Sequence, residues 1–316
     1  MDSPGRASAG EWADARHSVC YAKAYAKSVY CNDWGNHIMC PTYSIIFLDI
    51  DGTLVDSKHE VSENTKQLLN RLEKRGIPVI LCSARNPAGI EVVEKQVGLH
   101  SPIVCYGGSL VLSAGRAILE DKGFSPESAL RFKQYAGEQF PEVVVSTYLY
   151  DTWVVDDADN PWVQRDAGIL QCEPIAGDLA SAAQSVAHVH KLLCVGPPVQ
   201  VTRLQSAAAS LFPELQLLRS GAEYMEVLKN GVSKRTAVET LQMHYQLRRE
   251  EIVACGDHYV DLEMLQYAGL GIAMGNAPEA VKEAADRVTA SNDEEGVYIA
   301  LKSLRFSPPP KKDSGQ

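Results

Sequence analysis

The stretch "SIIFLDIDGTLVDS", residues 44–57, places two carboxylates at the end of an apolar run. Asp49 and Asp51 are separated by one apolar residue, and Gly52 follows them. The run predicts a buried strand, whose alternate side chains point the same way, so the two like charges repel unless a cation lies beside them. A divalent metal such as Mg²⁺ prefers oxygen ligands, and Gly52 lets the backbone turn sharply. The alternative is a pair of exposed turn acids, because D-x-D-G also occurs in loops and calcium sites.

The composition argues against several broad classes of protein. Acidic residues outnumber basic ones 40 to 30 in a chain of 316 residues, and the formal charge is −10. This balance disfavours a nucleic-acid or anionic-membrane surface. No run approaches the roughly 20 apolar residues that cross a bilayer. The start of the chain lacks the apolar core of a signal peptide. We therefore expect a cytoplasmic protein with no nucleic-acid and no membrane partner.

Apolar runs alternate with helical patterns along much of the chain. After residues 44–57, "SENTKQLLNRLEKRG" predicts a helix that Ser62 caps and Gly76 ends. The further predicted strands are "IPVILCSA" (77–84), "SPIVCYGG" (101–108), "EIVACGD" (251–257), "GLGIAMG" (269–275) and "DRVTAS" (286–291). Strands that are apolar on both faces and alternate with helices predict a Rossmann-like α/β fold, a parallel sheet covered on both sides.

The middle of the chain has a different pattern. "EVVVSTYLY" (142–150) and "TWVVDD" (152–157) alternate apolar and polar residues, which predicts an antiparallel sheet with one exposed face. We therefore expect a second, smaller α/β domain inserted into the first. The predicted boundaries are a core of residues 43–122 and 225–306, an inserted domain of residues 123–224, and a flexible tail of residues 307–316.

The first 42 residues are set apart by composition. They are rich in Ala, Ser, Gly and Tyr and show no convincing period. We expect a disordered or non-native extension over residues 1–42. A sharper hypothesis is that translation starts at Met39.

Polar groups also follow the other predicted strands. Ser83 follows the second strand, while Asp257 ends a later one and Asp261 lies four residues beyond it. Lys234 lies near the start of a predicted helix, whose backbone amides favour an anion. Each residue has an ordinary alternative, Ser83 and Asp257 as helix caps and Lys234 as a solvated lysine. Their common place at the carboxyl ends of strands, where open sheets bind ligands, favours one joint site.

These motifs together resemble a known family. "DIDGTL", "SAR", "GVSKRTA" and "GDHYVDLEML…GIAMGNAPEAVKEAADRVTASNDEEGV" look like the four motifs of the haloacid dehalogenase superfamily. They are most similar to its Cof-type, or type IIB, phosphatases, and the likeness spans about residues 44–303. The long interval between Ser83 and Lys234 places the cap there, as in the type II branch, and the resemblance implies a type IIB cap.

The resemblance implies a role for each residue. Asp49 would attack phosphorus and form an aspartyl phosphate, which divides hydrolysis into two displacements. Asp51 would protonate the leaving alcohol and then deprotonate the attacking water. The implied ligands of Mg²⁺ are the Asp49 carboxylate, the Asp51 backbone carbonyl, Asp257 and Asp261. The implied contacts to the phosphoryl group and the substrate come from Gly52, Ser83, Arg85 and Lys234.

Three positions depart from the Cof-type pattern, and they concern the substrate more than the chemistry. Ala84 stands where the family has Gly, and Tyr106 and Val260 stand where it has Asn. We expect a Mg²⁺-dependent phosphatase of a small phosphorylated metabolite, either a sugar phosphate or a phosphorylated cofactor, in a monomer or homodimer. The alternatives are a phosphomutase, which needs cap groups that grip a sugar in two orientations, and a non-catalytic ligand-binding or regulatory protein.

The cap carries polar and aromatic residues with more than one interpretation. His188 and His190 alternate along a predicted strand, and without a third ligand nearby we favour packing or exposure over a metal site. Aromatic residues could close over a substrate, but such residues more often form the core. They are Tyr148, Tyr150, Trp153 and Trp162.

Overall fold

A computed structural model describes residues 41–170, 172–182 and 186–310 of the chain. From Thr42 onward the chain forms one compact unit that contains two large sheets. Nearly all of the predicted extension over residues 1–42, with the Met39 hypothesis, lies outside the described residues, as does the end of the predicted tail. In the described part of the chain, no helix is long and apolar enough to cross a membrane.

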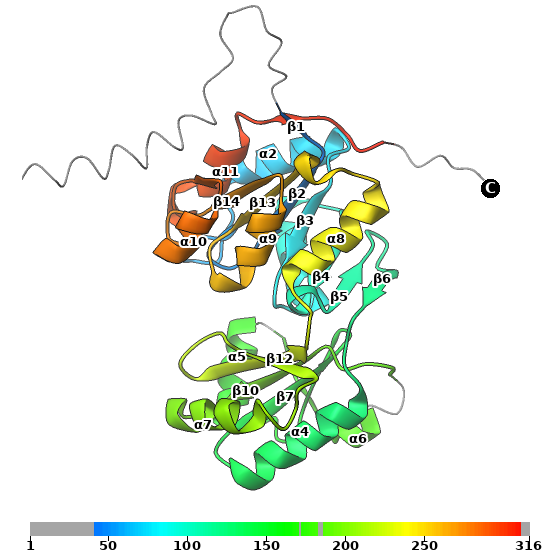
Figure 1. Cartoon of the computed structure of the whole chain (residues 1–316), viewed down its shortest axis with the longest axis vertical. Helices are drawn as coiled ribbons and strands as arrows, with labels where there is room; N and C mark the ends of the chain where they lie inside the picture. Colours follow the sequence, from blue (N-terminus) through cyan, green and yellow to red (C-terminus); the bar gives the residue numbers. More distant parts are fainter. Residues whose placement is uncertain (1–40, 171, 183–185, 311–316) are drawn as a thin grey trace, which may run out of the picture. The chain divides into compact units, whose positions relative to one another are not determined.

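The larger sheet has eight strands, in the order β15-β14-β13-β2-β3-β4-β5-β6 (Figure 1). The strands are β2 (Ile45–Asp49), β3 (Val79–Cys82), β4 (Ile103–Cys105), β5 (Leu110–Leu112), β6 (Ile118–Asp121), β13 (Ile252–Gly256), β14 (Leu270–Ala273) and β15 (Arg287–Val288). The strands from β15 to β4 are parallel, which confirms the predicted sheet. The antiparallel pair β5 and β6 extends one edge and was not predicted from the sequence.

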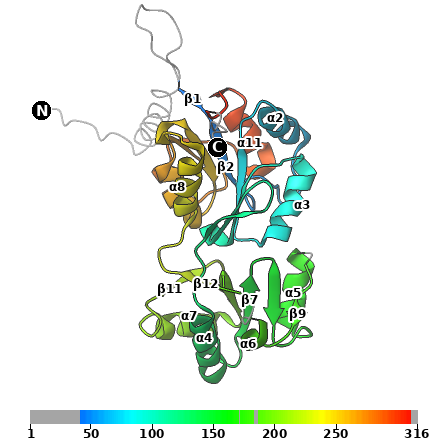
Figure 2. The ribbon, with the colours of Figure 1, turned by 90° about the vertical axis from the view of Figure 1, so that its right-hand side faces the viewer.

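Helices cover both faces of this sheet, as the apolar strands predict (Figure 2). One face packs against α2 (Glu63–Lys74), α3 (Pro87–Val97) and α11 (Gly296–Leu301). The other packs against α8 (Lys234–Tyr245), α9 (Leu262–Tyr267) and α10 (Glu279–Ala284). Alternation along β2 sends Ile46 and Leu48 to the first face and Ile45 and Phe47 to the second. Asp49 therefore lies on the side of α8.

Local sequence signals explain where several helices begin. The hydroxyl of Ser62 accepts the backbone N–H of Thr65 at 3.2 Å and caps α2, as predicted.

A short parallel pair joins β1 (Thr42–Tyr43) to β16 (Arg305–Phe306), near the two ends of the described chain. The short 3-10 helices are η1 (Tyr106–Gly108), η3 (Arg249–Glu251), η4 (Tyr259–Asp261) and η5 (Asn292–Glu294).

The second sheet belongs to the cap and has the order β11-β12-β10-β7-β8-β9. Its strands are β7 (Val144–Leu149), β8 (Thr152–Val155), β9 (Ile175–Ala176), β10 (Lys191–Val195), β11 (Leu215–Arg219) and β12 (Tyr224–Lys229). All neighbouring pairs are antiparallel except β8 and β9. The accompanying helices are α4 (Pro126–Gln139), α5 (Pro161–Leu170), α6 (Leu179–Ala182) and α7 (Pro198–Ala208).

The two faces of the cap sheet have different surroundings. One face packs against α4, α6 and α7 around a core that includes Phe132. The other was predicted to be exposed, but Tyr148 and Trp153 are buried there beside Val163 of α5. The prediction was wrong because alternation alone does not say which helices return to a face. β10 also begins at Lys191, so the predicted strand through His188 starts too early.

Candidate active site

The two predicted aspartates lie at the carboxyl end of β2, a central strand of the larger sheet. Asp49 is the last residue of β2, and Asp51 follows after the fully buried Ile50. β2 lies between β3 and β13, so its carboxyl end is flanked by Ser83 on one side and Asp257 on the other. Parallel neighbours bring these ends to one edge of the sheet, where open α/β sheets bind ligands. The structure thus brings the predicted residues together.

Lys234 is the first residue of α8, and its ammonium is buried among carboxylates. The residue is 2% exposed, which excludes a solvated surface lysine. Its Nζ donates to the Asp49 carboxylate and, at 2.6 Å, to Oδ1 of Asp261. Burial alone would lower the pKa of Lys234, but the Asp261 and Asp49 charges outweigh it and raise the pKa. The ammonium therefore stays charged beside the predicted nucleophile.

Asp257 and Asp261 are held by donors from two other segments and from their own turn. The Thr53 hydroxyl donates to Oδ1 of Asp257 at 2.8 Å, and the backbone N–H of Asp257 donates to Oδ2 of Asp261 at 3.1 Å. The Asn276 amide donates to the Gly52 carbonyl at 2.8 Å and lies 3.5 Å from the Asp257 carboxylate. Gly52 has φ +82°, and a Cβ there would overlap the Asp257 carboxylate. Glycine is therefore required both for the turn and for the close approach.

Asp49, Asp257 and Asp261 form a candidate metal centre. One carboxylate oxygen from each lies within 4.8 Å of the others. Burial raises the pKa of Asp49 well above its ordinary value, more than the Lys234 ammonium lowers it, and the other two carboxylates raise it further. Burial also raises the pKa of Asp257. Three carboxylates with one ammonium leave negative charge in a buried site, and an all-oxygen donor set suits a hard divalent cation. These residues fit a divalent metal.

Asp51 is placed differently from the metal cluster. Its side chain is 48% exposed, and its two oxygens accept from the Arg85 guanidinium, from Nε at 2.9 Å and from Nη2 at 2.5 Å. Such a bidentate pair fixes the orientation of a carboxylate as well as holding it. Arg85, the predicted substrate contact, pairs with Asp51 in the structure, and its contact with a substrate stays a prediction. The Asp51 carboxylate is therefore aimed by Arg85, and its predicted metal contact would come from its backbone carbonyl.

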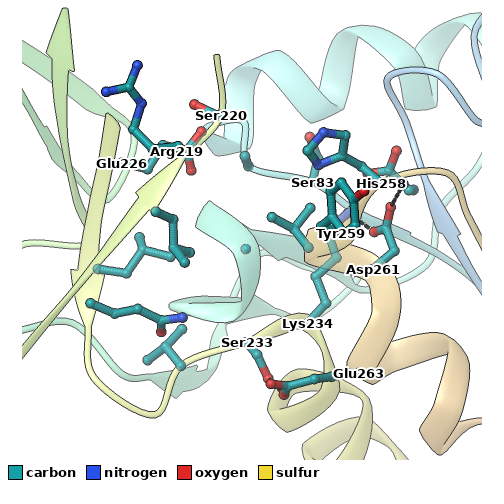
Figure 3. A pocket seen from close by; sticks show the side chains of 18 of the residues that line it. Ser83, Arg219, Ser220, Glu226, Ser233, Lys234, His258, Tyr259, Asp261 and Glu263 are labelled. Carbon is teal, nitrogen blue, oxygen red and sulfur yellow. Dashed lines mark hydrogen bonds and ion pairs between the residues drawn. The ribbon is translucent and has the colours of Figure 1, made fainter. Parts of the chain in front are cut away.

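An outer cavity of about 490 Å³ opens over this cluster (Figure 3). Its core wall includes Asp49, Ser83 and Lys234. Its cap wall includes Arg219 and Glu226, which Figure 3 labels together with Ser220. The Ser83 hydroxyl oxygen accepts the backbone N–H of Arg85 at 3.1 Å, which leaves its own proton available for an anion. Ser83 is thus placed to donate to a phosphoryl oxygen.

An inner cavity of about 250 Å³ adjoins the outer one. Asp51 and Glu226 line both cavities. The inner cavity is also lined by core residues that include Arg85 and by cap residues that include Tyr148 and Lys191. Asp51 therefore lies where the two cavities meet.

The departures from the family pattern have structural counterparts. Tyr106, in place of Asn, is fully buried with φ 52°, and its hydroxyl donates to the Tyr150 carbonyl. The Ala84 carbonyl accepts Nζ of Lys191 at 2.8 Å. Val260 is 42% exposed and lines the outer cavity. Tyr106 and Ala84 thus form contacts between core and cap, while Val260 makes its part of the outer cavity wall apolar.

The cap histidines lie beside Asp121 at the end of β6. His190 is fully buried, as the packing interpretation predicts, and its Nε2 lies 3.3 Å from Oδ1 of Asp121. His188 is partly exposed, and its Nδ1 lies 3.0 Å from the same oxygen. His190 is thus packed and His188 is partly exposed, which agrees with the favoured interpretation of packing or exposure. Among the described residues, the only group of three or more candidate metal ligands is the cluster of Asp49, Asp257 and Asp261.

Some residues of the site were not singled out from the sequence. Thr53 and Asn276 lie inside the quoted motifs, so their places in those motifs were the available signal. Glu226 reaches the site through the fold of the cap, and no local pattern marks it. Tyr148 was among the aromatic residues named from the sequence, and it is buried, as the core interpretation predicts.

Comparisons with known proteins cover most of the chain. Residues 46–301, more than half of the chain, match the family described as haloacid dehalogenase-like hydrolase. A Haemophilus influenzae protein with a provisional phosphatase name is 31% identical over 259 residues, 82% of this chain and 97% of the relative. The 5-amino-6-(5-phospho-D-ribitylamino)uracil phosphatase of Bacillus subtilis is 28% identical, over 82% of this chain and 96% of its own.

A solved structure extends the likeness to the cap. A sugar phosphatase of HAD subclass IIB superposes with a TM-score of 0.69 at 22% identity, over 82% of this chain and 98% of its own. At that identity the likeness concerns the fold alone. It confirms the predicted fold class, a parallel α/β core with an inserted α/β cap.

Proposed function

The chain belongs to the haloacid dehalogenase-like hydrolases, and we propose that it is a Mg²⁺-dependent phosphatase of a small phosphorylated metabolite that acts through an aspartyl phosphate. The observation that carries this proposal is the buried cluster at the end of β2. Asp49 there faces the Lys234 ammonium, and it lies beside Asp257 and Asp261. A carboxylate that is desolvated, fixed and surrounded by groups that neutralise phosphoryl oxygens is suited to attack phosphorus.

The proposed reaction consists of two displacements at phosphorus. In the first, an Asp49 oxygen attacks, the bond to the alcohol oxygen breaks, and Asp51 gives that oxygen a proton. In the second, Asp51 takes a proton from water, which attacks phosphorus and releases phosphate and the Asp49 carboxylate. The place of Asp51 between the two cavities supports this role, because the leaving oxygen must lie between the phosphoryl group and the rest of the substrate.

The remaining residues of the site would bind charge. A bound Mg²⁺ would neutralise negative charge on the phosphoryl group, held by the Asp49 and Asp257 carboxylates and the Asp51 carbonyl. Asp261 accepts backbone N–H groups and the Lys234 ammonium, which supports a role in orienting the neighbouring ligands. Ser83 and Lys234 would donate to the phosphoryl oxygens.

A small substrate is supported by the cap and by one relative. The cavities are bounded by cap residues as well as core residues, so the alcohol must fit beneath the cap sheet. The Bacillus subtilis relative is named for a substrate with a phosphate on a ribityl chain. A sugar phosphate or a phosphorylated cofactor fits both observations, whereas a phosphoprotein does not.

The proposal is tested by phosphate release from a panel of small phosphate esters. Activity should require Mg²⁺, disappear with a chelator and be lost in Asp49→Asn while the variant keeps the parent's circular dichroism. Turnover of a phosphoprotein in preference to every small ester would contradict the substrate class. No phosphate release from any ester by the folded parent with Mg²⁺ present would contradict the proposed phosphatase activity.

A further inference from the structure

The cap face that lines the two cavities carries a carboxylate with no partner. Glu226 lies on β12, and its cross-strand neighbours are Leu193 on β10 and Leu218 on β11. In the part of the chain that the structure describes, its carboxylate has no hydrogen bond and no ion pair. Cross-strand neighbours are the groups that usually satisfy a charge on a sheet, and here both are apolar. The carboxylate is therefore available to a ligand.

Tyr148, which lines the inner cavity, has a buried hydroxyl that also lacks a partner. Tyr148 is 2% exposed, and its phenol oxygen has no hydrogen bond within the described residues. Its ring stacks on Trp153 with the centroids 5.8 Å apart, and Nζ of Lys191 lies 4.7 Å from its centroid. Burial raises the pKa of Tyr148, and the Asp166 and Glu226 charges raise it further. Tyr148 is thus a neutral, rigidly held hydroxyl, and a buried one of this kind usually has a partner.

Two of the other polar groups of the inner cavity already have partners, while the exposed Ser220 has none among the described residues. Lys191 donates to the Ala84 carbonyl at 2.8 Å, and Asp166 accepts the Tyr224 hydroxyl at 2.7 Å. Asp51 and Arg85 form the ion pair described above. Apart from that pair, the cavity is lined by two carboxylates, those of Asp166 and Glu226, and by one ammonium. The Arg165 guanidinium lies 3.9 Å from Asp166 but also pairs with Glu223. The cavity therefore offers acceptors for hydroxyl protons and an excess of negative charge against a second anion.

We propose that Glu226 and Tyr148 are specificity-determining residues that select monophosphates whose alcohol carries several hydroxyl groups and no second anionic group. Glu226 accepts hydroxyl protons of the alcohol, and Tyr148 exchanges a hydrogen bond with another of its hydroxyls. The cavity of about 250 Å³ lies below the roughly 300 Å³ at which pockets for drug-sized ligands begin, which limits the alcohol to a small polyol or sugar. This inference rests on the proposed function, since it concerns the leaving group of that reaction.

The test compares kcat/KM for three esters in the parent, Glu226→Gln and Tyr148→Phe. The esters are a hexose monophosphate, a hexose bisphosphate and 4-nitrophenyl phosphate, whose leaving group has no hydroxyl to offer the cap. Glu226→Gln should lower kcat/KM for the monophosphate by about tenfold to a hundredfold, the effect of losing a charged hydrogen bond, and should raise it for the bisphosphate. Tyr148→Phe should lower the monophosphate value by about fivefold to tenfold. Both should leave 4-nitrophenyl phosphate within about twofold.

Controls separate this inference from folding and from the proposed function. Glu127→Gln removes an exposed cap carboxylate on α4, which packs on the other face of the cap sheet, and should change no ratio. Thermal melts show whether each variant is folded. Unchanged ratios between the esters in both folded variants would overturn the inference while hydrolysis itself stands. No phosphate release from any ester by the parent would overturn the proposed function and the subsite with it.

Discussion

Two aspartates that are two positions apart have opposite environments in this protein. Asp49 is 7% exposed and faces the Lys234 ammonium, while Asp51 is half exposed and is held by Arg85. A desolvated carboxylate is suited to attack, and a solvent-accessible one is suited to exchange protons. The difference arises because β2 ends at Asp49, inside the sheet, while Asp51 already belongs to the turn.

Replacement of Asp51 should show its role through the leaving group. Asp51→Asn keeps the shape but removes the proton, so kcat/KM for an alkyl phosphate should fall by about a hundredfold to ten-thousandfold. For 4-nitrophenyl phosphate the fall should be much smaller, because that leaving group departs without a proton. Steady-state kinetics with both esters checks this.

The matched control is Asp56→Asn, whose carboxylate accepts backbone N–H groups of its own turn. It should leave the ratio between the two esters unchanged. An equal loss for both esters in Asp51→Asn would contradict proton transfer to the alcohol by Asp51.

At the scale of elements, the position of α8 depends on a glycine in η1. Gly108 has φ +112°, and a Cβ there would overlap the Ser233 carbonyl, which directly precedes Lys234. Gly108→Ala should displace the start of α8 and misplace the ammonium, which costs about tenfold to a hundredfold in kcat/KM. It should also lower the denaturation midpoint, because alanine is strained at positive φ. Kinetics and urea unfolding measure the two effects.

Gly115→Ala is the matched control for this prediction. The nearest heavy atom to its added Cβ is the Ser113 hydroxyl at 4.0 Å, an ordinary contact. This variant should retain the parent's kinetics and midpoint. Parent-like activity in Gly108→Ala would show that α8 is not positioned through this contact.

The core elements were predictable because local and tertiary signals agree in them. The run that ends at Asp49 is buried on both faces, and Ser62 is both a good cap and the observed one. The β5–β6 pair was missed, since its strands are short and their partners are set by the sheet edge. In the cap, alternation identified β7 and β8 but not the helix α5 that covers part of their second face.

Some residues of the site could likewise be predicted from the sequence, and others could not. The end of each core strand places its polar residue, so Asp49, Ser83 and Asp257 could be predicted together. The ion pair between Arg85 and Asp51 could not be predicted, because it depends on side-chain orientation beyond the strand ends. Glu226 is placed by cross-strand register, which the sequence of β12 alone does not contain.

At the scale of the whole molecule, a buried histidine links stability to pH. Burial lowers the pKa of His190 from the ordinary 6.5 to about 4, although Asp121 raises it. The charge of the neighbouring His188 also lowers the pKa of His190. His190 therefore binds a proton near pH 6.5 in the unfolded chain but only near pH 4 in the folded protein. Stability is fully present above this window and falls as the pH drops through it.

Between pH 7 and pH 5 this single group should account for a loss of about 2 kcal/mol in the free energy of unfolding. His190→Gln keeps a hydrogen-bonding side chain but does not titrate, so its loss over the same interval should be smaller by that amount. Urea unfolding at the two pH values measures it. His100→Gln, at an exposed position, is the control and should lose as much as the parent. Equal losses in the parent and His190→Gln would contradict the buried neutral histidine.

We propose that Asp49 is phosphorylated during turnover. Peptide mapping tests this after rapid acid quench of the working enzyme with Mg²⁺ and a small phosphate ester. Borohydride reduction of the quenched protein converts an acyl phosphate at an aspartate to homoserine, which mass spectrometry locates. We expect homoserine at position 49 in the parent and none without Mg²⁺. Homoserine at another position, or parent-like phosphate release by Asp49→Asn, would contradict it.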